Sequence, residues 1–162
     1  MRLRRATPED HGPIGAVTIA AYEEFLLGAE DDYRHRLLDT AGRDREAELW
    51  VATAEDSNEI LGTVTICPEG SPWRELAEEG QGEFRMLAVS PAARRRGVGE
   101  ALTQMVVDRL RAQGATSIVM SSLSEMAGAH RLYGRLGFER APELDWHPVP
   151  EVSLIAFRLE LG

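Results

Sequence analysis

The sequence predicts an α/β fold of the α+β kind, with a mixed, mostly antiparallel sheet of about seven strands flanked by about four helices. The chain has 162 residues, of which 43% are apolar, enough to bury one core. A hairpin pattern in the first half predicts antiparallel pairing, and strands that alternate with helices in the second half predict at least one parallel pair. Because no segment is repetitive or linker-like, residues 1–162 are expected to form a single domain.

Seven segments have the apolar pattern and the flanking turn residues of strands, namely residues 3–6, 49–53, 60–66, 83–89, 117–121, 138–141 and 152–161. The polar turn Asp56-Ser57-Asn58 joins the second and third of these into an antiparallel hairpin. Residues 67–82 form a long connection with several prolines and glycines, and a helical turn is expected within it over residues 73–79.

Four segments have helical patterns, namely residues 7–22, 31–41, 97–113 and 124–136. Thr7 is expected to cap the first, with Pro8 at its first helical position. Ser124 is expected to cap the last, and Gly137 to end it. The link over residues 23–30 is expected to be a short loop of acidic and apolar residues.

Composition excludes several classes of protein. The chain has 27 acidic and 18 basic residues, a net charge of −9, so its overall field repels nucleic acids and anionic membranes and suits cationic small substrates. Every basic residue is arginine, which excludes a Walker-type phosphate loop and a Schiff-base lysine. Cys67 is expected to be an ordinary buried thiol. Without an apolar leader or a membrane-spanning run, the protein is expected to be cytoplasmic.

The loop Arg94-Arg95-Arg96-Gly97-Val98-Gly99 lies between the end of a strand and the start of a helix. Unpaired N–H groups and the helix dipole favour an anion there, and the two glycines allow its close approach to the backbone. Three arginines in an acidic chain strengthen this interpretation, although a solvated basic turn would also fit. A dinucleotide-binding motif does not fit, because Leu102 occupies the position of its third glycine.

The pattern Arg94-x-x-Gly97-x-Gly99 resembles the hallmark of the GNAT superfamily of acetyl-CoA-dependent N-acetyltransferases. Residues 86–91 resemble the fourth strand of that family, and residues 129–138 resemble its second motif. The resemblance implies splayed fourth and fifth strands with the coenzyme between them, acetyl-CoA as acetyl donor, and no metal. It implies coenzyme contacts at Leu87, Ala88, Val89, Arg94, Arg95, Arg96, Gly97, Val98, Gly99, Glu100, Ser124 and Met126.

Two catalytic candidates follow from the resemblance. Tyr133 lies where many members carry a phenol that protonates the leaving thiolate, although its spacing also suits a core tyrosine. Glu83 lies where some members carry the base that deprotonates the amine, although a same-strand ion pair with Arg85 is an equal alternative. The chain departs from the family at Met126, where many members have an asparagine, and Ser122 and Ser124 are the nearby substitutes.

The acceptor is expected to be a small-molecule or peptide amine bound between residues 22–33 and residues 143–150, which correspond to the family's acceptor loops. The first segment holds the acidic residues Glu23, Glu24, Glu30, Asp31 and Asp32, which suggest an amine or polyamine, although a solvated acidic loop is the better explanation of them. The second contains Asp145-Trp146-His147-Pro148. An exposed final strand would allow a homodimer. The alternative function is a non-catalytic acyl-CoA sensor or interaction module on the same fold.

Overall fold

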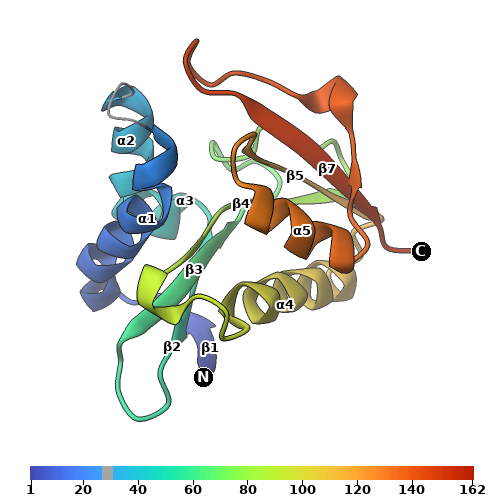
Figure 1. The fold of residues 1–162 in the computed structure, drawn as a ribbon. Helices are drawn as coiled ribbons and strands as arrows, with labels where there is room; N and C mark the ends of the chain where they lie inside the picture. The colour runs from blue at the N-terminus through green and yellow to red at the C-terminus, as the bar shows by residue number, and fades with distance from the viewer. Residues whose placement is uncertain (27–30) are drawn as a thin grey trace.

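One seven-stranded sheet in the order β1-β2-β3-β4-β5-β7-β6 organises the molecule (Figure 1). The structure is a computed structural model that describes residues 1–26 and 31–162. The strands are β1 (Arg2–Arg5), β2 (Glu48–Thr53), β3 (Ile60–Ile66), β4 (Gln81–Val89), β5 (Ser117–Leu123), β6 (Glu139–Arg140) and β7 (Leu154–Glu160). The helices are α1 (His11–Leu26), α2 (Asp31–Leu38), α3 (Thr40–Glu46), α4 (Val98–Ala112) and α5 (Ala127–Arg135), with 3₁₀ turns η1 (Pro8–Asp10), η2 (Pro91–Ala93) and η3 (Pro142–Leu144).

The sheet is mixed and mostly antiparallel, which confirms the predicted fold class. All adjacent strands are antiparallel except β4 and β5, which pair in parallel. That pairing joins Gln81, Gly82 and Glu83 to residues 117–119, and in the described chain no pair follows it. The remainder of β4 therefore separates from β5, and the expected splay is confirmed.

Helices cover both faces of the sheet, with α1 to α3 on one face and α4 and α5 on the other (Figure 1). The start of α4 packs closely on β3 at Gly62, where an added Cβ would lie 2.7 Å from Val98 Cγ1 and 3.0 Å from the Ala88 carbonyl. This close packing sets the loop before α4 beside the end of β4. None of the helices in the described parts of the chain is both long and apolar enough to span a membrane.

Strand β4 carries a bulge at its centre. Thr63 pairs with Ala88 and Thr65 with Arg85, so Met86 and Leu87 on β4 stand opposite a single residue on β3. Met86 has φ of 56°, a left-handed conformation that non-glycine residues rarely adopt. A bulge re-aims backbone and side chains locally, and this one lies at the point where β4 leaves β5.

The helical segments differ from the prediction in number and limits. The helix expected over residues 31–41 is two helices, because Asp39 begins α3 by accepting a hydrogen bond from the Gly42 N–H at 3.0 Å. This accounts for five helices in the described residues where about four were expected. Helix α1 also continues to Leu26, so the first half of the loop predicted over residues 23–30 is helical, and residues 27–30 lie outside the described residues.

Two local predictions were wrong for identifiable reasons. Residues 73–79 form no helical turn, because the N–H groups of Glu75, Leu76 and Ala77 donate to the Glu83 carboxylate and not to carbonyls of their own segment. Ser124 does not cap α5. Its N–H donates to the Ser153 carbonyl at 3.1 Å, so it continues the β5 edge, and Met126 is the N-cap.

We expect Asp10→Asn to lower the free energy of unfolding by about 2 kcal/mol at pH 7. Arg4 donates two hydrogen bonds to the Asp10 carboxylate, at 2.7 and 3.1 Å, and thereby lowers the pKa of Asp10 to about 2. Because the folded pKa lies below the unfolded one, this contribution is present above pH 4 and is lost as the pH falls towards 2. Urea unfolding of both proteins should show the difference shrinking in acid, and a difference that does not vary with pH would contradict it.

Candidate active site

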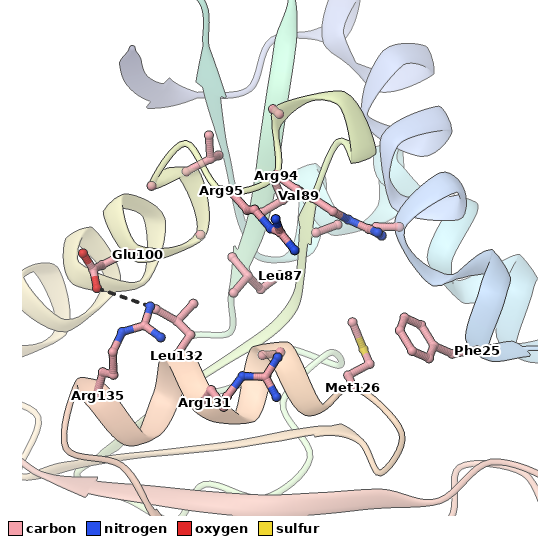
Figure 2. Close-up of a pocket in the computed structure, with 18 of the residues that line it drawn as sticks. Phe25, Leu87, Val89, Arg94, Arg95, Glu100, Met126, Arg131, Leu132 and Arg135 are labelled. Atoms are coloured by element: carbon pink, nitrogen blue, oxygen red, sulfur yellow. Dashed lines mark ion pairs between the residues drawn. The ribbon is translucent and has the colours of Figure 1, made fainter.

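A cavity of about 560 Å³ opens where β4 and β5 separate (Figure 2). It lies between the end of α1, the end of β4, the loop before α4, and α5. Its walls are formed by Ala21, Glu24, Phe25, Leu87, Ala88, Val89, Ala93, Arg94, Arg95, Gly97, Val98, Gly99, Glu100, Met126, Gly128, Ala129, Arg131, Leu132 and Arg135. Its size falls in the range of small-molecule and cofactor sites.

The loop from Arg94 to Gly97 lines this cavity and contains two residues in the left-handed conformation. Arg95 has φ of 64° and Gly97 has φ of 79°, and left-handed residues of this kind form concave N–H surfaces that bind anions. The N–H groups of the first turn of α4 have no acceptor within the helix. Gly99 has no side chain that could occupy the cavity. A Cβ at this position would lie 3.3 Å from Leu132 Cδ2, so α4 and α5 pack closely here.

The charge of the cavity opposes the charge of the whole chain. Arg94, Arg95, Arg131 and Arg135 line it together with two acidic residues. Glu24 pairs with Arg94 at 3.1 Å, and Glu100 pairs with Arg135 at 3.7 Å, as Figure 2 shows for the second pair. In a chain of net charge −9, this local excess of arginine would suit an anionic ligand.

Most residues predicted to contact the coenzyme line this one cavity. Those that line it are Leu87, Ala88, Val89, Arg94, Arg95, Gly97, Val98, Gly99, Glu100 and Met126, whereas Arg96 and Ser124 do not. Sequence reasoning missed Phe25 on α1 and Arg131 and Arg135 on α5. The two arginines are four residues apart and so share one face of α5 with Leu132, a helical spacing that would have indicated them.

Tyr133 lies behind the cavity wall and not in it. The residue is 3% exposed, and its ring packs against those of Phe84, Phe138 and Phe157 at centroid distances of 5.7 to 6.2 Å. In the described residues no hydrogen bond to its hydroxyl is present. Burial raises its pKa well above the ordinary value of a phenol, so the hydroxyl stays protonated at neutral pH.

Glu83 is fully buried and does not line the cavity. Its Oε1 accepts from the N–H groups of residues 75–77 at 2.9 to 3.0 Å, and its Oε2 is buried without a partner. Burial raises its pKa, and the three N–H bonds and Arg85 oppose that rise. The same-strand ion pair with Arg85, the alternative interpretation of Glu83, is not formed in the described residues, where Arg85 pairs with Glu75 at 3.7 Å.

The two segments expected to bind the acceptor, residues 22–33 and 143–150, contain both surface residues and buried ones. Glu23 pairs with Arg34 at 2.9 Å, and Glu24 is the only member of the acidic group that lines the cavity in the described residues. Glu30 lies outside the described residues, as do the side chains of Asp31 and Asp32. In the second segment, Trp146 packs into the core on the α1 face, where its ring lies 5.8 Å from the Arg85 guanidinium.

The structure thus combines a splayed mixed sheet with an arginine-lined cavity at the start of the following helix, the arrangement that the resemblance to the GNAT superfamily implied. The family model described as the Acetyltransferase (GNAT) family matches residues 15–138. The chain therefore belongs to the GNAT acetyltransferase family.

Curated relatives include two kinds of acetyltransferase. "N-acetyltransferase 8" of Rattus norvegicus is 33% identical over 121 residues, which are 70% of this chain and 50% of that protein. "Mycothiol acetyltransferase" of Beutenbergia cavernae is 38% identical over 90 residues, 56% of this chain and 28% of that protein. The chain thus spans half or less of the length of these relatives.

Solved structures share the fold over the whole chain. A GNAT acetyltransferase from Staphylococcus aureus Mu50 has a TM-score of 0.76 at 15% identity, and the match covers 99% of each chain. A putative acetyltransferase from Salmonella typhimurium, solved with its cofactor acetyl-CoA, has a TM-score of 0.69 at 22% identity, covering 100% of this chain and 94% of that one. These likenesses show the common fold.

Proposed function

We propose that this chain transfers an acetyl group from acetyl-CoA directly to an acceptor amine. The observation that carries the proposal is the arginine-lined cavity at the opening between β4 and β5. Its arginines and the N–H groups of residues 95–100 suit a pyrophosphate, and the backbone of Leu87 to Val89 along one wall suits the amides of a pantetheine arm. The volume of about 560 Å³ accommodates a ligand of that kind.

Acetyl-CoA, when bound, supplies the thioester acetyl group. The acceptor is an ammonium near neutral pH and must lose a proton before its nitrogen can form the new C–N bond. Glu83 is assigned as the base, acting through its unpartnered Oε2, and its raised pKa makes it a stronger base than an ordinary carboxylate. As the C–S bond breaks, the Tyr133 hydroxyl donates its proton to the thiolate. The Leu87 N–H is assigned to polarise the acetyl carbonyl.

The direct test measures free thiol release from acetyl-CoA with a panel of amines. Amine-dependent release of thiol together with an acetylated product is expected. Binding of coenzyme A without turnover on any amine would favour the non-catalytic sensor, and absence of coenzyme binding would contradict both functions.

We expect Glu24→Gln to tighten coenzyme A binding about two- to fivefold at low salt. Glu24 lines the cavity and holds Arg94 at 3.1 Å, so its removal frees a guanidinium for phosphate and removes a repulsive charge. Because both side chains are partly exposed, the gain should vanish at high ionic strength. Glu23→Gln is the matched control, since Glu23 pairs with Arg34 away from the cavity. Titration calorimetry that shows weaker binding by Glu24→Gln would contradict the assignment.

A further inference from the structure

The buried polar atoms that lack a hydrogen-bond partner gather in one place. In the described residues, the side-chain atoms of this kind are Arg43 Nε and Nη2, Thr65 Oγ1, Glu83 Oε2 and Arg85 Nη2. Folded proteins contain few such atoms, and each indicates a missing polar partner. We call these four residues the β4 polar cluster.

The sheet register explains why these residues meet. Thr65 on β3 stands opposite Arg85 on β4, so their side chains share a face of the sheet. Glu83 precedes Arg85 by two residues and lies on that same face. Arg43 reaches the strand from α3, where its Nη1 lies 2.7 Å from Met86 Sδ and donates to the Leu37 carbonyl at 3.1 Å. Donors and acceptors from three elements therefore converge on the centre of β4.

The β4 polar cluster carries an excess of positive charge. It contains two guanidinium groups against the single carboxylate of Glu83, and Arg43 is fully buried. Burial, with a smaller contribution from Arg85, lowers the pKa of Arg43 to about 10, so it remains charged at neutral pH. Two further carboxylates act on these guanidinium groups, since Glu75 lies 3.7 Å from Arg85 Nη1 and Asp39 raises the pKa of Arg43. Arg43 Nη2 and Arg85 Nη2 nevertheless stay buried without an acceptor, which is costly, so the cluster suits an additional hydrogen-bond acceptor such as a carboxylate.

The surroundings of Arg85 join the cluster to the reacting end of the cavity. Arg85 donates to the Trp73 carbonyl at 3.1 Å and lies against the Trp146 ring, so aromatic residues from two loops enclose it. Arg43 and Arg85 both act electrostatically on Tyr22, whose hydroxyl donates at 3.4 Å to the carbonyl of Leu87, a residue of the cavity wall. The β4 polar cluster therefore adjoins the bulge at which we place acetyl transfer.

We propose that Arg85 and Glu83 select an acceptor whose amine stands next to a carboxylate, as in an α-amino acid. The carboxylate would bind Arg85 Nη2 and the amine would face Glu83 Oε2. Residues two apart on a strand are separated by about 7 Å, which an amine and its neighbouring carboxylate span with one hydrogen bond at each end. A polyamine would instead add positive charge beside Arg43 and Arg85. This substrate class rests on the proposed transfer to an amine.

The test compares three acceptors that differ only beside the amine: phenylalanine, phenylalaninamide and phenethylamine. Initial rates are measured by thiol release and expressed per neutral amine. For the unaltered protein, kcat/KM is expected to be roughly 10- to 100-fold higher for the amino acid than for the amide or the amine, the range of a hydrogen bond between charged groups. In Arg85→Gln, the ratio of kcat/KM for phenylalanine to kcat/KM for phenylalaninamide should fall to about one, because KM for phenylalanine rises. Arg85→Lys should restore part of this ratio.

Arg111→Gln is the matched control, because Arg111 is an exposed arginine on α4, and it should keep the ratio of the unaltered protein. Acetyl-CoA affinity, measured by calorimetry, reports whether each variant is folded. Transfer to phenethylamine or to the amide that equals transfer to the amino acid would overturn the carboxylate subsite and leave the acetyltransferase function intact. Coenzyme binding without transfer to any of the three or to other amines would overturn both.

Discussion

Replacing Tyr133 by phenylalanine is expected to lower kcat about 100-fold and to leave the Kd for acetyl-CoA unchanged. The hydroxyl is the only group removed, and in the described residues it makes no hydrogen bond, so the fold loses no interaction. The phenol is protonated at neutral pH, and burial raises its pKa, which makes it a weaker acid than an exposed tyrosine. Single-turnover kinetics with a good acceptor, beside calorimetric titration of acetyl-CoA, would measure both quantities.

The control for this variant is Phe138→Leu, which disturbs the same aromatic cluster without touching the hydroxyl. Phe138 packs 5.8 Å from the Tyr133 ring, and its replacement should lower the free energy of unfolding by about 1 to 2 kcal/mol while changing kcat less than about threefold. Equal kcat for Tyr133→Phe and the unaltered protein would show that Tyr133 is a core residue.

Replacing Glu83 by glutamine is expected to lower kcat/KM about 100-fold at pH 7 and to remove the acid limb of the pH profile. The glutamine carbonyl oxygen can still accept from the three N–H groups of residues 75–77, so the variant removes the base and keeps the loop. Since burial raises the pKa of Glu83 above 4.5, the rate of the unaltered protein should fall as the pH drops through that raised value. If the variant keeps the acid limb of the pH profile, water or another group, and not Glu83, accepts the proton of the amine.

Stability provides an independent check on Glu83. A carboxyl group whose pKa is higher in the folded than in the unfolded protein does not reduce the free energy of unfolding in acid, where it is protonated. It reduces that free energy as the pH rises through the folded-state pKa and the group ionises. Glutamine does not ionise, so Glu83→Gln should be as stable as the unaltered protein or more stable at pH 7. A large loss of stability at pH 7 would show that the negative charge itself holds residues 75–77.

Sequence patterns predicted the parts of the fold that depend on neighbouring residues. The hairpin of β2 and β3, the strand that ends at Val89, and the glycine-arginine loop before α4 all follow from local alternation and turn residues. The splay of β4 and β5 followed from the family resemblance. The strand and residues 94–100 together supply nine of the nineteen described residues that line the cavity.

Features set by distant residues were not predictable in this way. Residues 73–79 contain helix-forming residues, yet the N–H groups of residues 75–77 donate to the carboxylate of Glu83. Arg43 lies in the polar stretch of α3 and its sequence context is typical of an exposed arginine, yet tertiary packing buries it against Met86. The amino-acid acceptor that we propose from these buried arginines is therefore narrower than the small-molecule or peptide amine that the sequence predicted.

The most direct test of the central claim is the affinity for coenzyme A compared with that for pantetheine. If the Arg94–Gly99 loop and the arginines of α5 hold the pyrophosphate, calorimetry should show coenzyme A binding at least about 100-fold more tightly than pantetheine, since two or more charge-assisted hydrogen bonds distinguish them. Equal affinities, or no binding of coenzyme A, would contradict the assignment of this cavity.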